Sequence, residues 1–364
     1  MDFQNIGHQE WAKLNGGQFC FDLSGSGAPA LTASEFPPLA EPAGVEGMPG
    51  YGFSDLAALI ARHYGTNRDR VLWAAGTSLA NFLVAAAVVR PGDDVLVERP
   101  TYEPLRGIPT ALGANLIRFD RRADAGFVPD LDEIAALTTP RTSLIMLSNL
   151  HNPSHTALPA GFLGRLHELA RERRIHVLVD EVYLEFALDP GVSPGPHAAA
   201  TLGPEMISTS SLTKVYGLGG LRAGWAILDG ALRAHAFRVA DYLGVNESTP
   251  SARISARVLR GLPGLALRSR KAAARGRAVF TDWLAGRSDL AEVAPAGGMV
   301  AFARITSGVN SRRLATHLAA RYDTLVTPGE FFESPGFIRI GLGLPSERLA
   351  EALGRLGRAL DDLA

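Results

Sequence analysis

Lysine is rare in this chain, and one lysine stands in a setting that suits covalent chemistry. Only three lysines, Lys13, Lys214 and Lys271, occur among the 36 Lys and Arg residues. Lys214 follows a predicted strand and precedes a glycine-rich turn in the string SLTKVYGLGGLRAGW, residues 211–225. A lysine that traps an aldehyde must be held at a fixed point and must be able to lose its proton. This placement favours Lys214 over the other two lysines as a reactive amine.

The polar groups near Lys214 indicate what such an amine could hold. Ser211 and Thr213 offer hydroxyl groups, and Arg222 offers a fixed cation. Together these groups would suit a phosphate dianion beside an imine. A lone lysine at the end of a strand is usually an ordinary structural residue, but the whole string favours a cofactor site.

The string, S-x-x-K followed by K-x-x-G-L-x-G-L-R-x-G-W, resembles the cofactor-lysine segment of the class I/II aminotransferases. These are pyridoxal-phosphate (PLP) enzymes of fold type I, the aspartate aminotransferase superfamily. The resemblance implies that Lys214 holds pyridoxal 5′-phosphate as a Schiff base. It also implies that Ser211 and Arg222 bind the cofactor phosphate.

A second motif, D-E-V-Y at residues 180–183, follows the apolar strand IHVLV. A carboxylate at the carboxyl end of a parallel strand points into the crevice where such sheets bind ligands. An anion beside a pyridine nitrogen keeps that nitrogen protonated and makes the ring an electron sink. By the resemblance, Asp180 faces the ring nitrogen and Tyr183 faces the ring hydroxyl, and both are catalytic with Lys214.

The loop SNLHNPSH, residues 148–155, contains Asn152-Pro153 where the family has N-P-x-G. The resemblance implies that Asn152 binds the ring hydroxyl of the cofactor and assists in binding the substrate. His155 stands where the family has glycine, so it is either a structural or solvent-facing residue or a group that enters the site. A metal site on His151 and His155 is disfavoured, because Pro153 breaks the helix that such a pair of ligands needs.

Two further elements could hold the cofactor. Gly76, Thr77 and Ser78 lie at a strand-to-helix junction, where free backbone N–H groups and the helix dipole favour an anion. Tyr102, in ERPTYEP, follows a strand end and could stack on a flat heterocycle or pack as an ordinary loop tyrosine. The resemblance assigns the turn to the cofactor phosphate and Tyr102 to the face of the pyridine ring.

Arg339, in FIRIGLG, offers a guanidinium fork that suits a substrate carboxylate. The family's carboxylate-binding arginine lies in a similar strand after a P-G-x-x-F element, which residues 327–332 (TPGEFF) supply here. Tyr51, in GYGFSDL, matches a tyrosine that the family often supplies to the phosphate from the neighbouring subunit. The resemblance therefore also implies a homodimer.

The elements that must position these residues alternate between strands and helices. Several strands are continuous apolar runs, which is typical of strands covered by helices on both faces. This pattern predicts an α/β fold with a doubly wound, mostly parallel sheet between helices. The predicted strands are VLWAA, DVLVER, NLIRFD, TSLIMLSNL, IHVLVD, EMISTSS and AGWAIL.

The pattern changes near residue 250, where a long Ala/Arg-rich helical stretch runs to about residue 287. The strands MVAFARI and FIRIGLG, with helices between and after them, predict a smaller α+β domain. We therefore expect an N-terminal arm at residues 1–40, a large PLP-binding domain at 41–250 and a small C-terminal domain at 251–364.

The predicted activity is transfer of an amino group between an amino acid and a 2-oxo acid. The alternative is another PLP reaction on an amino acid, namely decarboxylation, β- or γ-elimination or replacement, or cyclisation as in capreomycidine synthase-like enzymes, which FDLSGSGAPALT and LSNLHNPS loosely resemble. A fold does not fix a reaction. A PLP-binding transcriptional regulator is disfavoured, because no N-terminal extension is long enough for a winged helix.

Composition limits the partners and the location. The formal net charge of −1, without acidic or basic blocks, disfavours a nucleic-acid surface. No apolar stretch is long enough to span a bilayer, and no signal peptide is predicted. The single cysteine, Cys20, cannot form an internal disulfide, which suits the reducing cytoplasm.

Overall fold

A seven-stranded sheet forms the centre of the computed structural model, which describes residues 3–32, 34–36, 53–189, 192, 194–293 and 297–364. The strand order is β2-β8-β7-β6-β5-β3-β4. Neighbours from β7 to β4 are parallel, while β8 runs antiparallel to both β7 and β2. The strands are β2 (Val71–Ala74), β3 (Asp94–Arg99), β4 (Asn115–Asp120), β5 (Thr142–Ser148), β6 (His176–Asp180), β7 (Met206–Ser211) and β8 (Gly224–Ile227). All seven predicted strands are confirmed.

Helices cover both faces of this sheet, as the apolar runs predict. In β5, Leu144 and Met146 pack into a core with α3, α4 and α7, whereas Ile145 and Leu147 pack into a core with α5 and α6. Successive side chains of a strand point to opposite faces, so a strand buried on both sides must be apolar throughout. The helices flanking the sheet are α2 (Ser54–Tyr64), α3 (Thr77–Val88), α4 (Glu103–Ala111), α5 (Leu131–Leu137), α6 (Phe162–Arg173) and α7 (Gly230–Leu243).

The C-terminal part has its own sheet, with the antiparallel order β12-β13-β10-β9. Residues 249–284, predicted as one helical stretch, form two helices separated at Gly261. The elements are α8 (Thr249–Leu259), α9 (Leu262–Leu284), β9 (Leu290–Glu292), β10 (Val300–Ile305), α10 (Ser311–Tyr322), β11 (Thr324–Leu325), β12 (Thr327–Pro328), η7 (Gly329–Phe332), β13 (Phe337–Gly341) and α11 (Ser346–Asp361). No helix in the described part of the chain is both long and apolar enough to cross a membrane.

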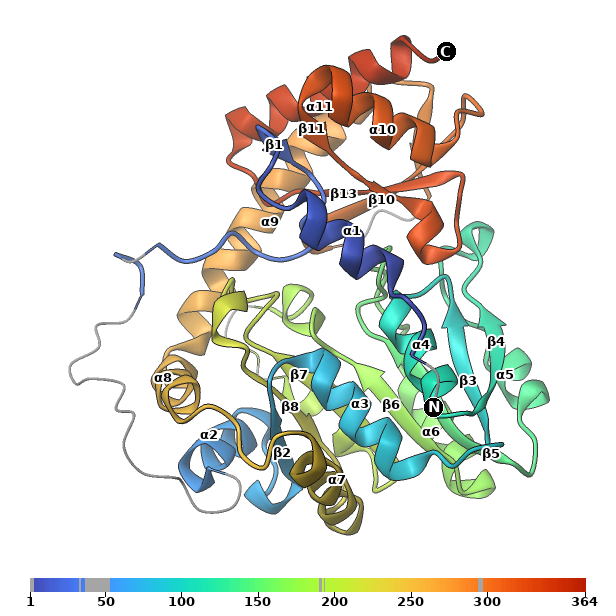
Figure 1. Ribbon diagram of the computed structural model, residues 1–364, viewed down its shortest axis with the longest axis vertical. Helices are drawn as coiled ribbons and strands as arrows, with labels where there is room; N and C mark the ends of the chain where they lie inside the picture. The colour runs from blue at the N-terminus through green and yellow to red at the C-terminus, as the bar shows by residue number, and fades with distance from the viewer. Residues whose placement is uncertain (1–2, 33, 37–52, 190–191, 193, 294–296) are drawn as a thin grey trace.

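The N-terminal segment, which we expect to be an arm, contains secondary structure that the sequence pattern did not indicate. It contains helix α1 (Gly7–Asn15) and strand β1 (Phe21–Asp22), which pairs in parallel with β11. In Figure 1, α1 lies between the seven-stranded sheet and the C-terminal sheet. Of its nine residues only His8 is buried, so the helix has almost no apolar stripe that a sequence pattern could reveal.

Candidate active site

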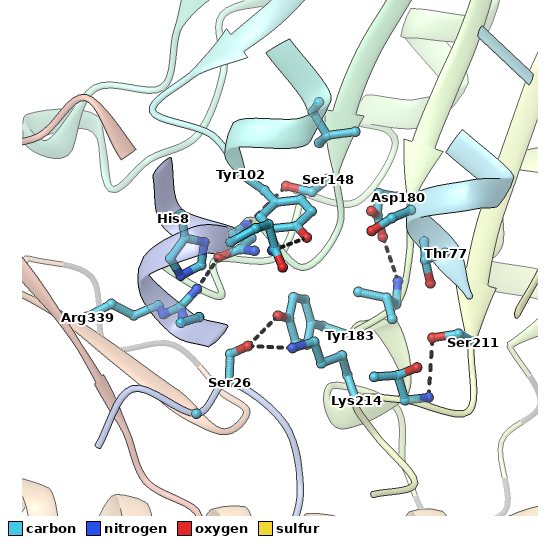
Figure 2. Close-up of a pocket in the computed structure, with 18 of the residues that line it drawn as sticks. His8, Ser26, Thr77, Tyr102, Ser148, Asp180, Tyr183, Ser211, Lys214 and Arg339 are labelled. Atoms are coloured by element: carbon cyan, nitrogen blue, oxygen red, sulfur yellow. Dashed lines mark hydrogen bonds between the residues drawn. The ribbon is translucent and has the colours of Figure 1, made fainter. Parts of the chain in front are cut away.

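A cavity of about 310 Å³ opens at the carboxyl ends of the parallel strands and gathers most of the predicted site residues (Figure 2). Ser148, Asp180 and Ser211 reach it from the ends of β5, β6 and β7, as expected for an open parallel sheet. The predicted residues that line it are Thr77, Ser78, Tyr102, Asn152, Asp180, Tyr183, Ser211, Lys214, Arg222 and Arg339. Gly76 adjoins the cavity as the cap of α3, and Tyr51 lies outside the described residues.

One end of the cavity, which we call the α3 end, is formed by Thr77, Ser78, Ser211 and Arg222. Gly76 has a φ of 98°, and a Cβ there would lie 2.6 Å from Arg222 Nη2, so a side chain would strain the backbone and displace the guanidinium. No side chain caps α3, and Thr77 Oγ1 is buried without a hydrogen-bond partner. Free N–H groups at a helix start, a spare hydroxyl and a cation together can bind an anion.

Asp180 is buried at the end of β6 and is held by polar neighbours. Asn81 Nδ2 donates to Asp180 Oδ2 at 2.9 Å, while Asn81 Oδ1 accepts from Thr209 Oγ1 at 2.6 Å. Val182 N donates to Asp180 Oδ1 at 3.2 Å. Burial raises the pKa of Asp180 to about 6, against the hydrogen bonds from Asn81 and Val182, which lower it. A cationic partner would restore its ordinary acidity.

Lys214 and Tyr183 both contact the hydroxyl group of Ser26. Ser26 Oγ lies 3.0 Å from Lys214 Nζ and accepts from the Tyr183 hydroxyl at 2.9 Å, as Figure 2 shows. Burial, followed by the charge of Arg339, lowers the pKa of Lys214 to about 8. The amine therefore has a substantial neutral fraction near pH 8, which a nucleophile or a general base requires.

The opposite end, which we call the β13 end, is formed by Arg339 and Asn152. Arg339 is 2% exposed; its Nη1 donates to Asn152 Oδ1 at 3.0 Å and its Nη2 donates to Ser24 O at 3.1 Å. The guanidinium lies 4.8 Å from the ring centre of Phe332, and its Nε has no partner. Burial lowers the pKa of Arg339, so a carboxylate would compensate a desolvated cation.

Helix α1 closes the cavity beside Tyr102. Gln9 Nε2 donates to the Tyr102 hydroxyl at 2.6 Å, and the backbone N–H of His8 donates to Glu103 Oε2 at 2.7 Å. His8 also packs against Phe331, with ring centres 5.4 Å apart. Burial raises the pKa of Tyr102 to about 12 and lowers that of His8 to about 3, so both side chains are neutral.

His155 does not line the cavity and does not face solvent. It is 1% exposed, and its ring centre lies 4.3 Å from that of Tyr183, behind the site. His151 uses both ring nitrogens on protein partners, Ser154 Oγ and Pro100 O. No group of three or more metal-ligating side chains occurs within the described residues.

The prediction missed several residues that line the cavity or support its carboxylate. His8, Gln9, Ser24 and Ser26 come from the segment expected to be an arm, where no periodicity marks them. Asn81 carried a usable signal, since it is one amide within the apolar helix sequence LANFLVAAAV. A buried polar side chain in such a helix needs a partner, and here that partner is Asp180.

This sheet, together with a buried lysine in the same cavity as a strand-end carboxylate and a turn that suits an anion, is the arrangement of a PLP-dependent enzyme of fold type I. The chain belongs to the aminotransferase class I and II family, whose model matches residues 10–356. Its enzyme class is therefore that of the PLP-dependent aminotransferases, and its cofactor is pyridoxal 5′-phosphate.

Individual relatives cover most of the chain. Capreomycidine synthase of Streptomyces vinaceus is 30% identical over 86% of this chain and 88% of its own length. Arginine–pyruvate transaminase AruH of Pseudomonas aeruginosa is 32% identical over 81% of this chain and 76% of its own. The crystal structure of a PLP-dependent aminotransferase from Streptococcus suis superposes with a TM-score of 0.89 at 25% identity, covering 100% of this chain and 99% of that one.

The side chains present fit this cofactor. The partnerless Thr77 hydroxyl and the Arg222 guanidinium suit a phosphate, and the buried Asp180 suits a protonated pyridine nitrogen. Tyr102 lies beside the same cavity and offers an aromatic face.

Proposed function

We propose that this protein moves an amino group between an amino acid and a 2-oxo acid, with Lys214 as the residue that bonds to the cofactor. The observation that carries the proposal is the position of Lys214 Nζ. It is buried in one cavity between the α3 end, which suits a phosphate, and the β13 end, which suits a carboxylate. An amine between these two anion sites is positioned to act on the Cα of a bound amino acid.

The bound cofactor supplies an aldehyde that condenses with amines and a pyridine ring that withdraws electrons from the substrate Cα. Asp180 would hold a proton at the ring nitrogen, because its buried carboxylate needs a cationic partner. Tyr183, whose hydroxyl now donates to Ser26, would donate to the ring oxygen instead. The phosphate would be bound by the Gly76 turn together with Thr77, Ser78, Ser211 and Arg222. Tyr102 would offer its aromatic face to the ring, and Asn152 would bind the ring hydroxyl.

Lys214 moves the proton that the reaction displaces. With a pKa of about 8, its Nζ would accept the proton that leaves the substrate Cα and would hold it for return to the product. Arg339 binds the substrate carboxylate through its guanidinium fork, and Asn152 keeps that fork oriented. The same contact with Arg339 would bind amino acids and 2-oxo acids, because both carry this carboxylate.

Borohydride reduction tests the assignment of Lys214. We expect reduction of the yellow holoenzyme to fix the cofactor on the peptide that contains Lys214, and Lys214→Ala to abolish both labelling and activity. Lys271→Ala is the matched control and should behave as the wild type. A label on Lys13 or Lys271 in peptide mapping, or no label, would refute the proposal.

A second candidate is a cyclisation or another PLP reaction on an amino acid. The similarity to capreomycidine synthase over 86% of the chain favours this alternative. Single-turnover absorbance separates the two activities. An aminotransferase converts its cofactor fully to the amine form with an amino acid and recovers it with a 2-oxo acid, whereas a cyclase regenerates its starting spectrum without an oxo acid.

We also propose a cytoplasmic homodimer whose sites include Tyr51 of the neighbouring subunit. Support for a dimer comes from an exposed apolar group at the C-terminal end of α7, where Tyr242, Leu243 and Val245 are 93%, 55% and 68% exposed. The exposed free thiol of Cys20 suits a reducing compartment. Sedimentation at micromolar concentration should give a dimer, and a fully active monomer would contradict this proposal.

A further inference from the structure

His155 occupies a backbone conformation that favours glycine. Its φ is 57°, in the left-handed region, and its N–H donates to His151 O at 2.5 Å to close the turn after β5. A side chain with a Cβ is strained in this region. A histidine at this position therefore carries backbone strain that glycine would avoid.

The ring is fixed from the C-terminal sheet. Met299 N, which precedes β10, donates to His155 Nδ1 at 3.3 Å. Because Nδ1 accepts, a neutral ring carries its proton on Nε2, which is buried without a partner. Burial, and then the charges of Arg339, Arg277 and Lys214, lower the pKa of His155 well below its usual value, so the ring is neutral.

Gly298 provides the space that this ring occupies. Its φ is +89°, and a Cβ there would lie 2.4 Å from His155 Nδ1. The two residues fit each other across the gap between the turn after β5 and the start of β10. Gly298 and Met299 thus form a site that fits the imidazole ring.

On its other side the ring meets Tyr183. The ring centres lie 4.3 Å apart with planes inclined by 46°, and Phe186 completes the contact at 6.2 Å. The Tyr183 hydroxyl donates to Ser26 Oγ, which lies 3.0 Å from Lys214 Nζ. A continuous series of contacts therefore links Met299 to the reactive amine.

We propose that His155 is a positioning residue that fixes the Tyr183 ring from behind, so that the Tyr183 hydroxyl is placed to donate to the ring oxygen of the bound cofactor. This inference rests on the proposed function of Lys214 and Tyr183. A donor to that oxygen stabilises negative charge there and favours the unprotonated state of the nitrogen that joins Lys214 to the cofactor. A loosely held Tyr183 donates less well and makes that nitrogen more basic.

A pH titration of the holoenzyme absorbance tests the proposal, because it reports the pKa of that nitrogen without turnover. Glycine suits the φ of residue 155, so His155→Gly should fold. We expect its titration midpoint to rise by roughly half a unit to one unit. In a Tyr183→Phe background, which lacks the hydroxyl, His155→Gly should cause no further rise. No shift in the single variant, or an equal shift in both backgrounds, overturns the proposal.

His155→Asn separates the ring from its tether. Asparagine tolerates the left-handed region and offers an oxygen to Met299 N, but it cannot pack as an imidazole does against Tyr183. We expect the same rise as with glycine, whereas a wild-type midpoint would overturn the role of the ring. Failure of borohydride to label Lys214 in the wild type would instead refute the proposed function, so the two failures are distinguishable.

Discussion

At the α3 end of the cavity, Gly76, Ser211 and Arg222 meet because β8 lies between β2 and β7. Gly224 of β8 pairs with Ala74 on one side and with Ser211 on the other. At the β13 end, by contrast, Arg339 is held by a turn 187 residues away and by Ser24, 315 residues away. One end is assembled within a single sheet, and the other depends on docking of the N-terminal segment against two sheets.

The difference has a physical basis. Groups that follow neighbouring strands of one sheet are brought together by the ladder hydrogen bonds alone. Groups on separate elements are brought together only by tertiary packing, here of α1 and the N-terminal segment. The two ends should therefore respond differently to mutation, and the following predictions test this.

The largest effect should come from replacing either of the two arginines by lysine. Arg339→Lys cannot reproduce the fork, so binding of amino acids and 2-oxo acids should weaken by roughly tenfold to a thousandfold while the cofactor stays bound. Arg222→Lys should instead loosen the cofactor. Equilibrium titrations of cofactor and of substrate measure both. Loss of cofactor with Arg339→Lys, and of substrate alone with Arg222→Lys, would reverse our assignment of the ends.

Asp180→Asn should slow turnover by about a hundredfold or more, because an amide cannot keep the pyridine nitrogen protonated. The cofactor should remain bound, since both ends of the cavity are unchanged. Glu181→Gln is the matched control, as Glu181 is also buried but accepts from Ala199 N, away from the cavity. Steady-state kinetics with equal losses in both variants would remove Asp180 from its role.

The pH dependence of cofactor addition should show which of the two ends affects the pKa of Lys214 more. With a pKa lowered to about 8, its neutral fraction falls about tenfold for each pH unit below that value. Addition to the apoenzyme, followed by stopped-flow absorbance, should therefore rise with pH and level off above about 8. Arg339→Gln should move the midpoint upward more than Arg222→Gln, because Arg339 lowers this pKa more. A midpoint near that of free lysine in the wild type would contradict the burial of the amine.

The smallest effect concerns α1. Gln9→Ala removes the hydrogen bond to Tyr102, worth about 1 kcal/mol, so KM for amino acids should rise about fivefold. Lys13→Ala, on the exposed side of the same helix, should leave KM unchanged. If Gln9→Ala had no effect on KM, the hydrogen bond from α1 to Tyr102 would make no contribution to substrate binding.

Sequence predicted the sheet, because apolar runs are local signals. The residues of the α3 end line one cavity as expected, and their predicted role in binding the phosphate stays a prediction. Asp180, Asn152 and Arg339 also line the cavity as expected. The family resemblance brought these three residues together, because their spacing in the sequence does not. The contribution of α1 could not be predicted, because its contacts are made by two side chains and one backbone N–H rather than by an apolar stripe. The burial of His155 was equally unpredictable, since it depends on Gly298, which is distant in sequence.

The pairing of β1 with β11 has a consequence for biosynthesis. Phe21 must find Thr324, so this pair cannot form until more than 300 further residues have left the ribosome. At roughly 5–20 residues per second, translation alone imposes a delay of about 15 to 60 seconds. During that time Ser26 can already contact Tyr183 and Lys214, whereas Ser24 still lacks its partner Arg339. The β13 end of the cavity, which needs both Ser24 and Arg339, is therefore the last part of the site that translation can complete.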